Sequence, residues 1–465
     1  MTTGAVSIAF SSIFADKRYE KMTSFHERGS IPTQGVPVID DYDVIICGAG
    51  PAGIGATIAA ARSGARTLLI EYLAHVGGMA TSANTISWCD TPGGPVFDEL
   101  VERLKRVGAA EINYVPERYH RPGRIRFHAE TLKIAALDMI LESGAKVSFC
   151  TIAESAWTNE GKVSGVFIAN KAGRSKIKAS VVTDATGDGD IAASAGAQFH
   201  KGDPKDGRLQ HVNFRFSMEG INGKGFKQDG PSEEALLEMI KVAQKEGRIR
   251  PPRGIFSPAP ETFPYDLANH RMNHGYWEIQ GVDSTDPVAV NETLCDCHQA
   301  VMDILRFCRK HLPGYEKCRV GKLQTLLGVR ESRRILGRYL LTRKDVVCAR
   351  KFEDGIARAS FWIDFHDSPP GHTLPYSLDY VKATRPAEGD WYEIPYGCLV
   401  PKEISGILVA GRCISCDRDA QASLRVMPTC FFTGAAAGRA ATMSVSQSIL
   451  PHELDGRQVR QALLE

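Results

Sequence analysis

The sequence has almost no net charge and no long hydrophobic run. Its 465 residues include 56 Lys and Arg and 54 Asp and Glu, which gives a formal charge of +2. This balance predicts neither a nucleic-acid-binding surface nor attraction to an anionic membrane. No uninterrupted apolar stretch is long enough to span a bilayer. We therefore expect small molecules, rather than nucleic acid or a membrane, as partners.

The sequence also lacks the cysteine pattern of a disulfide scaffold or an iron–sulfur protein. Twelve cysteines are scattered along the chain, many in apolar, strand-like segments. Such cysteines are typical of reduced, buried thiols in a cytosolic enzyme. Cys295, Cys297 and His298 have some spacing typical of metal ligands, but no second pair is nearby, so no metal is expected. The apolar piece near the N-terminus has no basic leader, which favours a cytoplasmic protein.

The pattern of elements predicts one α/β domain built from both ends of the chain. "YDVIICGAG", "PAGIGATIAAARSG" and "RTLLIE" form a strand, a helix and a strand, and the middle third is richer in charge, proline and aromatics. The expected parts are an N-terminal arm (1–40), a first part of the α/β domain (41–215), an inserted α+β domain (216–394), a closing part (395–447) and a C-terminal tail (448–465).

A glycine motif marks the first turn of this domain. Gly48, Gly50 and Gly53 form G-x-G-x-x-G between the first strand and the first helix, and Glu71 ends the next strand. Glycines here permit a tight turn and close approach of a pyrophosphate to the helix N-terminus, while the carboxylate accepts hydrogen bonds from ribose hydroxyls. The sequence therefore predicts a dinucleotide site. No second motif of this kind is present, so a separate NAD(P)H domain is not expected.

Later segments indicate which dinucleotide is bound. "VVTDATGDGD" supplies a strand followed by Gly187 and Asp188, and "ILVAGR" ends in Gly411 and Arg412. Together with the glycine motif, they resemble the FAD-binding domain of the glutathione-reductase-like flavoprotein superfamily. "GVRESRRILGRYLLTRKD", "YEIPYGCLVPK" and "LRVMPTC" more narrowly resemble the FAD-dependent oxidoreductase family. The resemblance implies an α/β fold, with a Rossmann-like FAD-binding domain of the glutathione-reductase type and an inserted α+β substrate domain.

The expected cofactor is therefore FAD, bound by residues from seven parts of the chain. They are Gly48, Gly50, Pro51, Ala52, Gly53, Glu71, Gly78, Met79, Ala80, Ala153, Ala185, Gly187, Asp188, Gly411, Arg412 and Thr433. In related flavoproteins a helix following such a Gly411 segment points its N-terminus at flavin N1 and the C2 carbonyl. Here Pro428 and Thr429 suit its first turn, and Cys413 and Cys416 are expected to pack beside the cofactor rather than act as a dithiol.

The resemblance implies oxidation of a small organic substrate by hydride transfer to flavin N5. Oxygen or an electron carrier would then accept the electrons. Two alternatives stay open: reduction of an activated double bond, as in fumarate-reductase-like proteins, and an electron-relay subunit. The sequence also leaves a homo-oligomer open.

Four residues are the candidates for the chemistry. A base with a pKa near neutral suits C–H oxidation, and a cation helps the developing negative charge. We expect His372, ahead of His366, as proton acceptor, and Arg425 and Tyr396 to line the flavin-facing cleft; Tyr396 packing through a backbone hydrogen bond is the alternative. The segment from Arg330 to Arg334 is expected to be helical, either as an exposed, ion-paired face or, as the family resemblance implies, with an Arg–carboxylate pair at the domain interface.

Overall fold

The computed structural model describes residues 35–85, 87–89, 91–113, 124–250, 255–257, 265–266, 271–366 and 377–464. Most of the expected N-terminal arm lies outside these residues. The predicted β-α-β unit is confirmed as β1 (Val38–Cys47), α1 (Pro51–Arg62) and β2 (Thr67–Ile70). The buried residues of β1 and β2 pair in parallel, from Val44 with Thr67 to Cys47 with Ile70.

The main sheet combines parallel strands with an antiparallel meander. Its parallel part has the order β6 (Lys146–Ser148), β2, β1, β9 (Gly173–Asp184) and β19 (Ile407–Val409), and the meander adds β8 (Lys162–Asn170) and β7 (Ile152–Asn159). Cys47 of β1 and Val409 of β19 both pair with Asp184 of β9. The carboxyl ends of strands from both ends of the chain therefore meet at one edge of the sheet.

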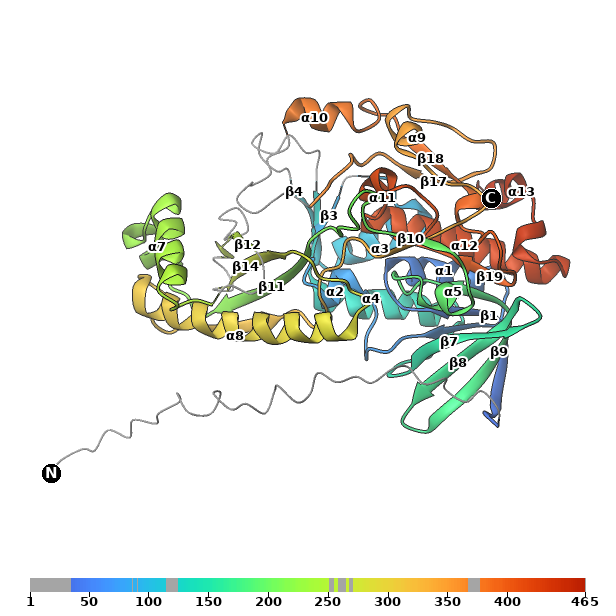
Figure 1. Cartoon of the computed structure of the whole chain (residues 1–465), viewed down its shortest axis with the longest axis horizontal. Coiled ribbons are helices and arrows are strands. Elements are labelled where there is room, and N and C mark those ends of the chain that lie inside the picture. The colour runs from blue at the N-terminus through green and yellow to red at the C-terminus, as the bar shows by residue number, and fades with distance from the viewer. Residues whose placement is uncertain are drawn as a thin grey trace.

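A small-residue helix packs across the first helix. α12 (Met427–Gln447) lies against α1 (Figure 1), and both helices are largely buried. A Cβ at Gly434 would lie 2.0 Å from the Ala52 carbonyl oxygen, and one at Gly438 would lie 2.1 Å from that of Ala56. Backbone-to-backbone contact explains why small residues recur here. The Gly/Ala run of α12 therefore packs closely against α1.

A second hydrophobic core lies to one side of the main sheet (Figure 1). Its antiparallel sheet has the order β12-β14-β11-β15, with β13 beside β14, and helices cover it. The elements are β11 (Val212–Glu219), α6 (Gly223–Asp229), α7 (Glu233–Lys245), β12 (Ile255–Ser257), β13 (Tyr265–Asp266), β14 (Arg271–Ile279), α8 (Pro287–His311) and β15 (Arg319–Leu323). Its buried residues run from Val212 to Leu327.

Residues 330–394 pack differently from the expectation for one insert at 216–394. Buried residues of β17 (Gly355–Ala359) and β18 (Tyr392–Pro395) belong to the first hydrophobic core, and so does Val459 of α13 (Gly456–Leu464). By packing, the second core therefore ends near Leu327. The helix expected from Arg330 to Arg334 is wrong: Arg333–Ile335 form β16, which pairs antiparallel with β10 (Phe199–Lys201).

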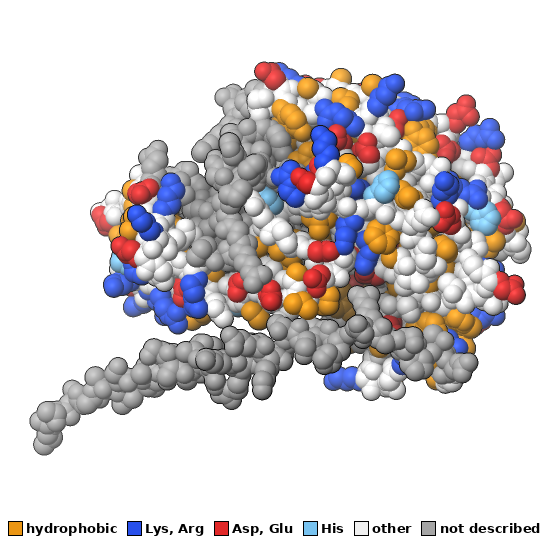
Figure 2. All heavy atoms as spheres, viewed as in Figure 1, with side chains coloured by type: hydrophobic (Ala, Val, Ile, Leu, Met, Phe, Trp, Pro, Cys, Tyr) orange, Lys and Arg blue, Asp and Glu red, His pale blue; other side chains and the backbone are white. Residues whose placement is uncertain are grey.

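Short elements complete the described part of the fold. They are α2 (Met79–Ser82), β3 (Ser87–Trp88), α3 (Gly94–Arg106), β4 (Ala110–Asn113), β5 (Arg124–Phe127), α4 (Ala129–Glu142), α5 (Asp190–Ser194), α9 (Arg343–Val347), α10 (Leu378–Ala383), the 3-10 turns Tyr396–Cys398 and Pro451–Glu453, and α11 (Arg418–Leu424). Acidic and basic side chains intermingle on the face seen in Figure 2. Within the described ranges, no helix is long and apolar enough to cross a membrane.

Candidate FAD site

The three motif glycines are required by three different contacts. Gly48 has a φ of +96°, and a Cβ there would lie 2.7 Å from the Ala185 carbonyl oxygen. A Cβ at Gly53 would lie only 1.7 Å from the Gly48 carbonyl oxygen, so this glycine lets the helix approach the turn. Gly50 meets nothing nearer than the Gly78 Cα at 4.0 Å. The open side of Gly50 at the start of α1 suits a pyrophosphate.

The Glu71 side chain is hydrogen-bonded to the backbone of this turn. Its Oε2 accepts a hydrogen bond from the Ala49 N–H at 2.7 Å, and its Oε1 accepts one from the Leu73 N–H at 2.9 Å. The residue is 5% exposed, and burial raises the pKa of its carboxyl group although the two backbone donors lower it. Glu71 therefore fixes the backbone of the glycine turn, in addition to the role as ribose acceptor expected from the sequence.

The Gly77–Gly78 segment closes over the same turn. The Gly77 N–H donates to the Ala49 carbonyl at 2.8 Å. Gly78 has a φ of +48°, and a Cβ there would lie 2.8 Å from the Gly50 Cα and 3.5 Å from the Pro51 ring. The helix α2 starts directly after Gly78, so its first residues, Met79 and Ala80, follow the segment that contacts the glycine turn.

The loop after β9 brings an ion pair to this edge of the sheet. Arg412 donates through Nη2 to the Asp188 carboxylate at 2.7 Å, and the two side chains are 12% and 22% exposed. A Cβ at Gly187 would lie 2.7 Å from the Arg412 guanidinium, so the glycine, with a φ of +82°, makes room for that cation. Gly187, Asp188 and Arg412, which are far apart in sequence, form one contact.

Asp184 orders the loop that carries Asp188. Its Oδ1 accepts from the backbone and hydroxyl of Thr186 at 3.1 and 2.7 Å, and its Oδ2 accepts from the Ala192 N–H at 2.8 Å. Burial raises the pKa of Asp184 to about 6. Asp184, the last residue of β9, therefore holds the loop that follows this buried strand.

The start of α12 joins the site through Gly411. The Gly411 N–H donates to Thr433 Oγ1 at 3.2 Å. Its φ is +86°, and a Cβ there would lie 3.0 Å from the Ala52 Cβ of α1. In the first turn of α12, Thr429 is fully buried, and its Oγ1 has no hydrogen-bond partner within the described part of the chain. An unpaired hydroxyl beside a helix N-terminus fits a polar group of a bound cofactor.

The residues present therefore fit FAD. Glycines create close approaches that a side chain would fill, a helix N-terminus faces the open side of Gly50, and Glu71 and Arg412 supply charges of both signs. Ala153 lies in β7, where it pairs with Ile168 of β8. It is two residues beyond Thr151, whose N–H donates to the Glu71 carbonyl at 3.1 Å, so its strand begins beside the glycine turn.

The comparison with known proteins agrees with this geometry. Residues 43–463 match the family described as FAD dependent oxidoreductase. The chain belongs to this family. It is an FAD-dependent oxidoreductase, and FAD is its cofactor.

Individual relatives are more distant. A thiamine thiazole synthase of Aeropyrum pernix is 29% identical over 126 residues, which is 27% of this chain and 43% of that protein. A soluble pyridine nucleotide transhydrogenase of a Marinomonas species is 49% identical over 45 residues, 10% of each chain. The matches thus span less than half of these relatives. A geranylgeranyl bacteriochlorophyll reductase-like structure from Thermoplasma acidophilum is 13% identical with a TM-score of 0.44, over 91% of this chain and 83% of that one.

Cys413 and Cys416 of this oxidoreductase are enclosed in the protein. Both are fully buried, and their sulfurs lie 3.5 Å from the Ala410 carbonyl and 3.4 Å from the Ile414 carbonyl. Burial raises the pKa of both thiols. Each of the twelve cysteines is a free thiol, and no group of metal-ligating side chains is found among the described residues. The two thiols therefore have the environment of packing residues, because a reactive thiolate needs a lowered pKa.

Two of the four candidate catalytic residues lie in one cluster just before α12. Arg425 donates through Nη2 to the Asp364 carbonyl at 2.7 Å, and the same nitrogen is 3.9 Å from the Asp364 carboxylate. His366 Nε2 lies 3.3 Å from that carboxylate. The Arg425 Nη2 also lies 3.5 Å from Gln210 Oε1. Sequence reasoning missed Asp364 and Gln210; the Asp-x-His spacing in "WIDFHD" is the signal for the first.

The other two candidates have different outcomes. Tyr396 is 4% exposed, its hydroxyl donates to the Pro451 carbonyl at 2.7 Å, and burial raises its pKa. This contact favours the alternative in which Tyr396 packs through a backbone hydrogen bond. His372 lies outside the described residues, so its role stays a prediction.

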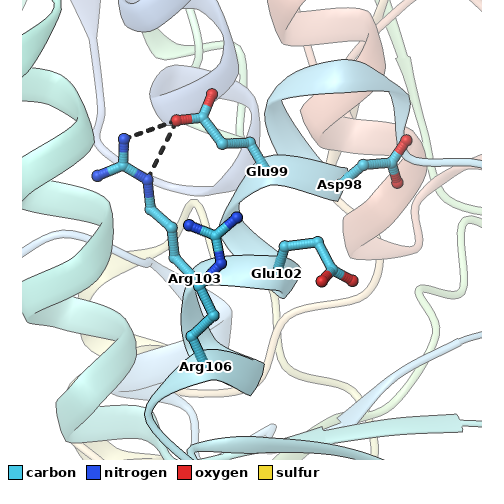
Figure 3. Close-up of a pocket in the computed structure, with 5 residues that line it drawn as sticks. All are labelled: Asp98, Glu99, Glu102, Arg103 and Arg106. Carbon is cyan, nitrogen blue, oxygen red and sulfur yellow. Dashed lines mark hydrogen bonds and ion pairs between the residues drawn. The ribbon is translucent and has the colours of Figure 1, made fainter.

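A surface pocket on α3 is separate from this site. Figure 3 shows its lining of acidic and basic side chains, with Arg103 paired to Glu99 at 2.7 Å. The lining residues are Asp98, Glu99, Glu102, Arg103 and Arg106. None of them is a residue expected to bind FAD or substrate. Glu99 also pairs with Arg62, Arg103 with Glu142, and Glu102 with Lys105. We therefore assign the pocket no role in the reaction.

Proposed function

We propose that this FAD-dependent oxidoreductase oxidises a small organic substrate by hydride transfer to flavin N5, with oxygen or an electron carrier as the final acceptor. Bound FAD supplies the two-electron acceptor. The observation that carries the proposal is the cluster of Arg425, Asp364 and His366 at the start of α12. The protein contributes a cation, a base and a carboxylate at one place.

His366 is the proton acceptor of this proposal. Its Nε2 faces the Asp364 carboxylate at 3.3 Å, and its side chain is 22% exposed. A carboxylate beside an imidazole orients the ring and stabilises the charge that forms when the ring takes a proton. The base can therefore receive the substrate proton while the carboxylate compensates the new charge.

Arg425 is the electrostatic group of the proposal. Its side chain is 11% exposed. It is the C-cap residue of α11 and lies two residues before α12, whose first turn contains the unpaired Thr429 hydroxyl. A partly buried guanidinium at this position favours negative charge on the substrate or on the cofactor. The helix N-terminus acts in the same direction.

The fold supports a site shared between the two cores. The Ser82 carbonyl at the end of α2 accepts from the Thr325 N–H at 2.8 Å, and Asn84 Nδ2 donates to the Arg215 carbonyl at 3.5 Å. His211, just before β11, donates its N–H to the His366 carbonyl at 2.7 Å. The second core thus contacts the cofactor segment and the His366 segment, which supports its proposed role in substrate binding.

The test is anaerobic bleaching of the yellow holoenzyme by a panel of alcohols, amines, hydroxy acids and sugars. One of them should reduce the flavin in a single turnover. With that compound, His366→Ala should slow flavin reduction by roughly 10²- to 10⁴-fold, because it removes the base. Asp364→Asn should slow it less, and FAD should stay bound in both variants. Wild-type rates in both variants across pH would contradict the assignment of the base. If an activated alkene reoxidises the reduced enzyme and no donor bleaches the flavin, the enzyme is instead a reductase of activated double bonds.

A further inference from the structure

A buried ion cluster connects strand β16, helix α11 and the segment that leads into the second core. The Glu331 carboxylate accepts from Arg334 Nη1 at 2.6 Å and from Arg418 Nε at 3.1 Å. Arg418 also pairs with Asp203 at 2.9 Å. The side chains of Glu331, Arg334 and Arg418 are 0%, 3% and 8% exposed. Buried charges of this kind are tolerated only when they are paired and hydrogen-bonded.

The Glu331 carboxylate accepts from the main chain as well as from cations, because the Oε2 that lies 3.1 Å from Arg418 Nε has a second donor. Its Oε2 accepts from the Gln210 N–H at 3.0 Å. Gln210 is 2% exposed and 121 residues away in sequence. The carboxylate thus ties the backbone of Gln210 to a rigid cluster, rather than merely neutralising two guanidinium groups.

The side chain of Gln210 continues the connection toward the proposed reaction site. Its Nε2 donates to Gln421 Oε1 at 3.3 Å, and its Oε1 accepts from the His366 N–H at 3.3 Å. The next residue, His211, donates its N–H to the His366 carbonyl at 2.7 Å. The nitrogen and the oxygen of the Gln210 side-chain amide are therefore both hydrogen-bonded. The backbone N–H and carbonyl of His366 bond to Gln210 and His211.

We propose that Glu331 is a positioning residue for this reaction site, acting through Gln210 on the Asp364–His366 segment and so on Arg425. The inference rests on the proposed function, because it assumes that Arg425 acts on the bound FAD. The last link is the 2.7 Å bond from Arg425 Nη2 to the Asp364 carbonyl. Neither Glu331 nor Gln210 is assigned a contact with substrate.

Two explanations of a Glu331 effect predict opposite signs of the flavin midpoint potential. A cation near reduced, anionic flavin stabilises it and raises the potential. Glu331→Gln removes a negative charge, so a purely through-space effect would raise the potential. If Glu331 instead positions Arg425, its loss moves that cation away, and the potential falls.

The experiment measures the midpoint potential of the FAD-loaded protein in four variants, with dithionite as reductant and a reference dye. Arg425→Gln should shift the equilibrium toward oxidised FAD about tenfold, a decrease of about 30 mV. Gln210→Ala and Glu331→Gln should each shift it about threefold in the same direction, or about 15 mV. Gln210→Ala combined with Arg425→Gln should give no more than Arg425→Gln alone, because Gln210 acts through that side chain.

Glu393→Gln is the matched control. Glu393 is also buried, accepts from the Phe352 N–H at 2.9 Å, and pairs with Arg460 at 2.8 Å, but none of these residues belongs to the proposed site. It should leave the potential unchanged. If Glu331→Gln does not fold, Gln210→Ala decides the question, because it leaves the ion cluster intact.

The outcomes separate this inference from the proposed function. A fall with Arg425→Gln, but an unchanged or raised potential with Gln210→Ala and Glu331→Gln, overturns the positioning role and leaves the function of Arg425 standing. No change with Arg425→Gln overturns the role of Arg425 and the positioning inference with it. A fall in all three variants that is non-additive, with Glu393→Gln unchanged, supports the inference.

Discussion

Replacement of Glu71 by Ala tests the link between the glycine turn and FAD retention. The change removes the acceptor for the Ala49 and Leu73 N–H groups, which lie 2.7 and 2.9 Å from the carboxylate. An unsatisfied buried donor costs about 1–3 kcal/mol. Because Ala49 lies inside the glycine turn, part of this cost appears in FAD binding. A hydrogen bond from ribose to a charged acceptor adds about 1.5–3 kcal/mol, so we expect FAD affinity to fall at least 10-fold, and about 100-fold if both terms contribute.

The pH dependence of this effect has a defined sign. Burial raises the pKa of Glu71 above its usual 4.5. The folded apoprotein therefore binds this proton more tightly than the unfolded chain, and that contribution to stability is full below pH 4.5 and lost as pH rises through the raised pKa. FAD retention has the opposite trend, because the ionised carboxylate is the better acceptor. Wild-type protein should release FAD on mild acidification, and Glu71→Ala should lack this step.

The assay is a fluorescence titration of apoprotein with FAD at several pH values, together with thermal unfolding of the apo form. Glu99→Ala is a suitable control, because Glu99 is a partly exposed carboxylate on α3 whose partners are Arg62 and Arg103. It should leave FAD affinity unchanged. Wild-type affinity and an unchanged acid step in Glu71→Ala would refute the reasoning.

Three further predictions concern the cysteines, the helix contact and a buried carboxylate. Cys413→Ser with Cys416→Ser should leave flavin reduction by substrate largely intact with a modest loss of stability, whereas lost turnover at full FAD occupancy would indicate dithiol chemistry. Gly438→Val should lower the free energy of unfolding, measured by urea titration, by about 1–3 kcal/mol, because its Cβ would meet the Ala56 carbonyl at 2.1 Å; a wild-type urea midpoint would contradict this contact. The raised pKa of Asp184, about 6 against 3.8, should lower the unfolding free energy by about 1.4 kcal/mol per pH unit between these values as pH rises, and Asp184→Asn should flatten urea-midpoint profiles there.

The cofactor half of the site was predictable because its signals are local. A strand, a glycine turn and a helix follow one another within residues 38–62, and each glycine has a steric reason that a short motif expresses. Gly411 and Arg412 were predicted from the family resemblance, and they follow a short buried strand. Their contact with Gly187 and Asp188 depends on β19 pairing with β9. Parallel neighbouring strands bring together the residues that follow their carboxyl ends, which explains why Gly411 and Arg412 lie beside Gly187 and Asp188.

The reaction half was harder because its contacts are distant in sequence and its residues are ordinary in type. Tyr396 stands beside a predicted strand and looks suitable for catalysis, yet its hydroxyl bonds to the Pro451 carbonyl. Asp364 has no motif of its own, and its value comes from Arg425, which is 61 residues away. The type of a residue does not specify its hydrogen-bond partner, so only the fold shows that Tyr396 bonds to the backbone while Asp364 contacts Arg425.

The segment from Arg330 to Arg334 shows why charge patterning misled. Arginines and a glutamate at close spacing favour an exposed helix with ion pairs along one face. Arg334 does pair with Glu331, but the same carboxylate also accepts from Gln210 and Arg418. A glutamate on a solvent-exposed helix would not be expected to accept hydrogen bonds from residues as distant in sequence as Gln210 and Arg418. The buried arrangement requires that the partners lie on other elements, and these partners are the basis of the positioning role that we propose for Glu331.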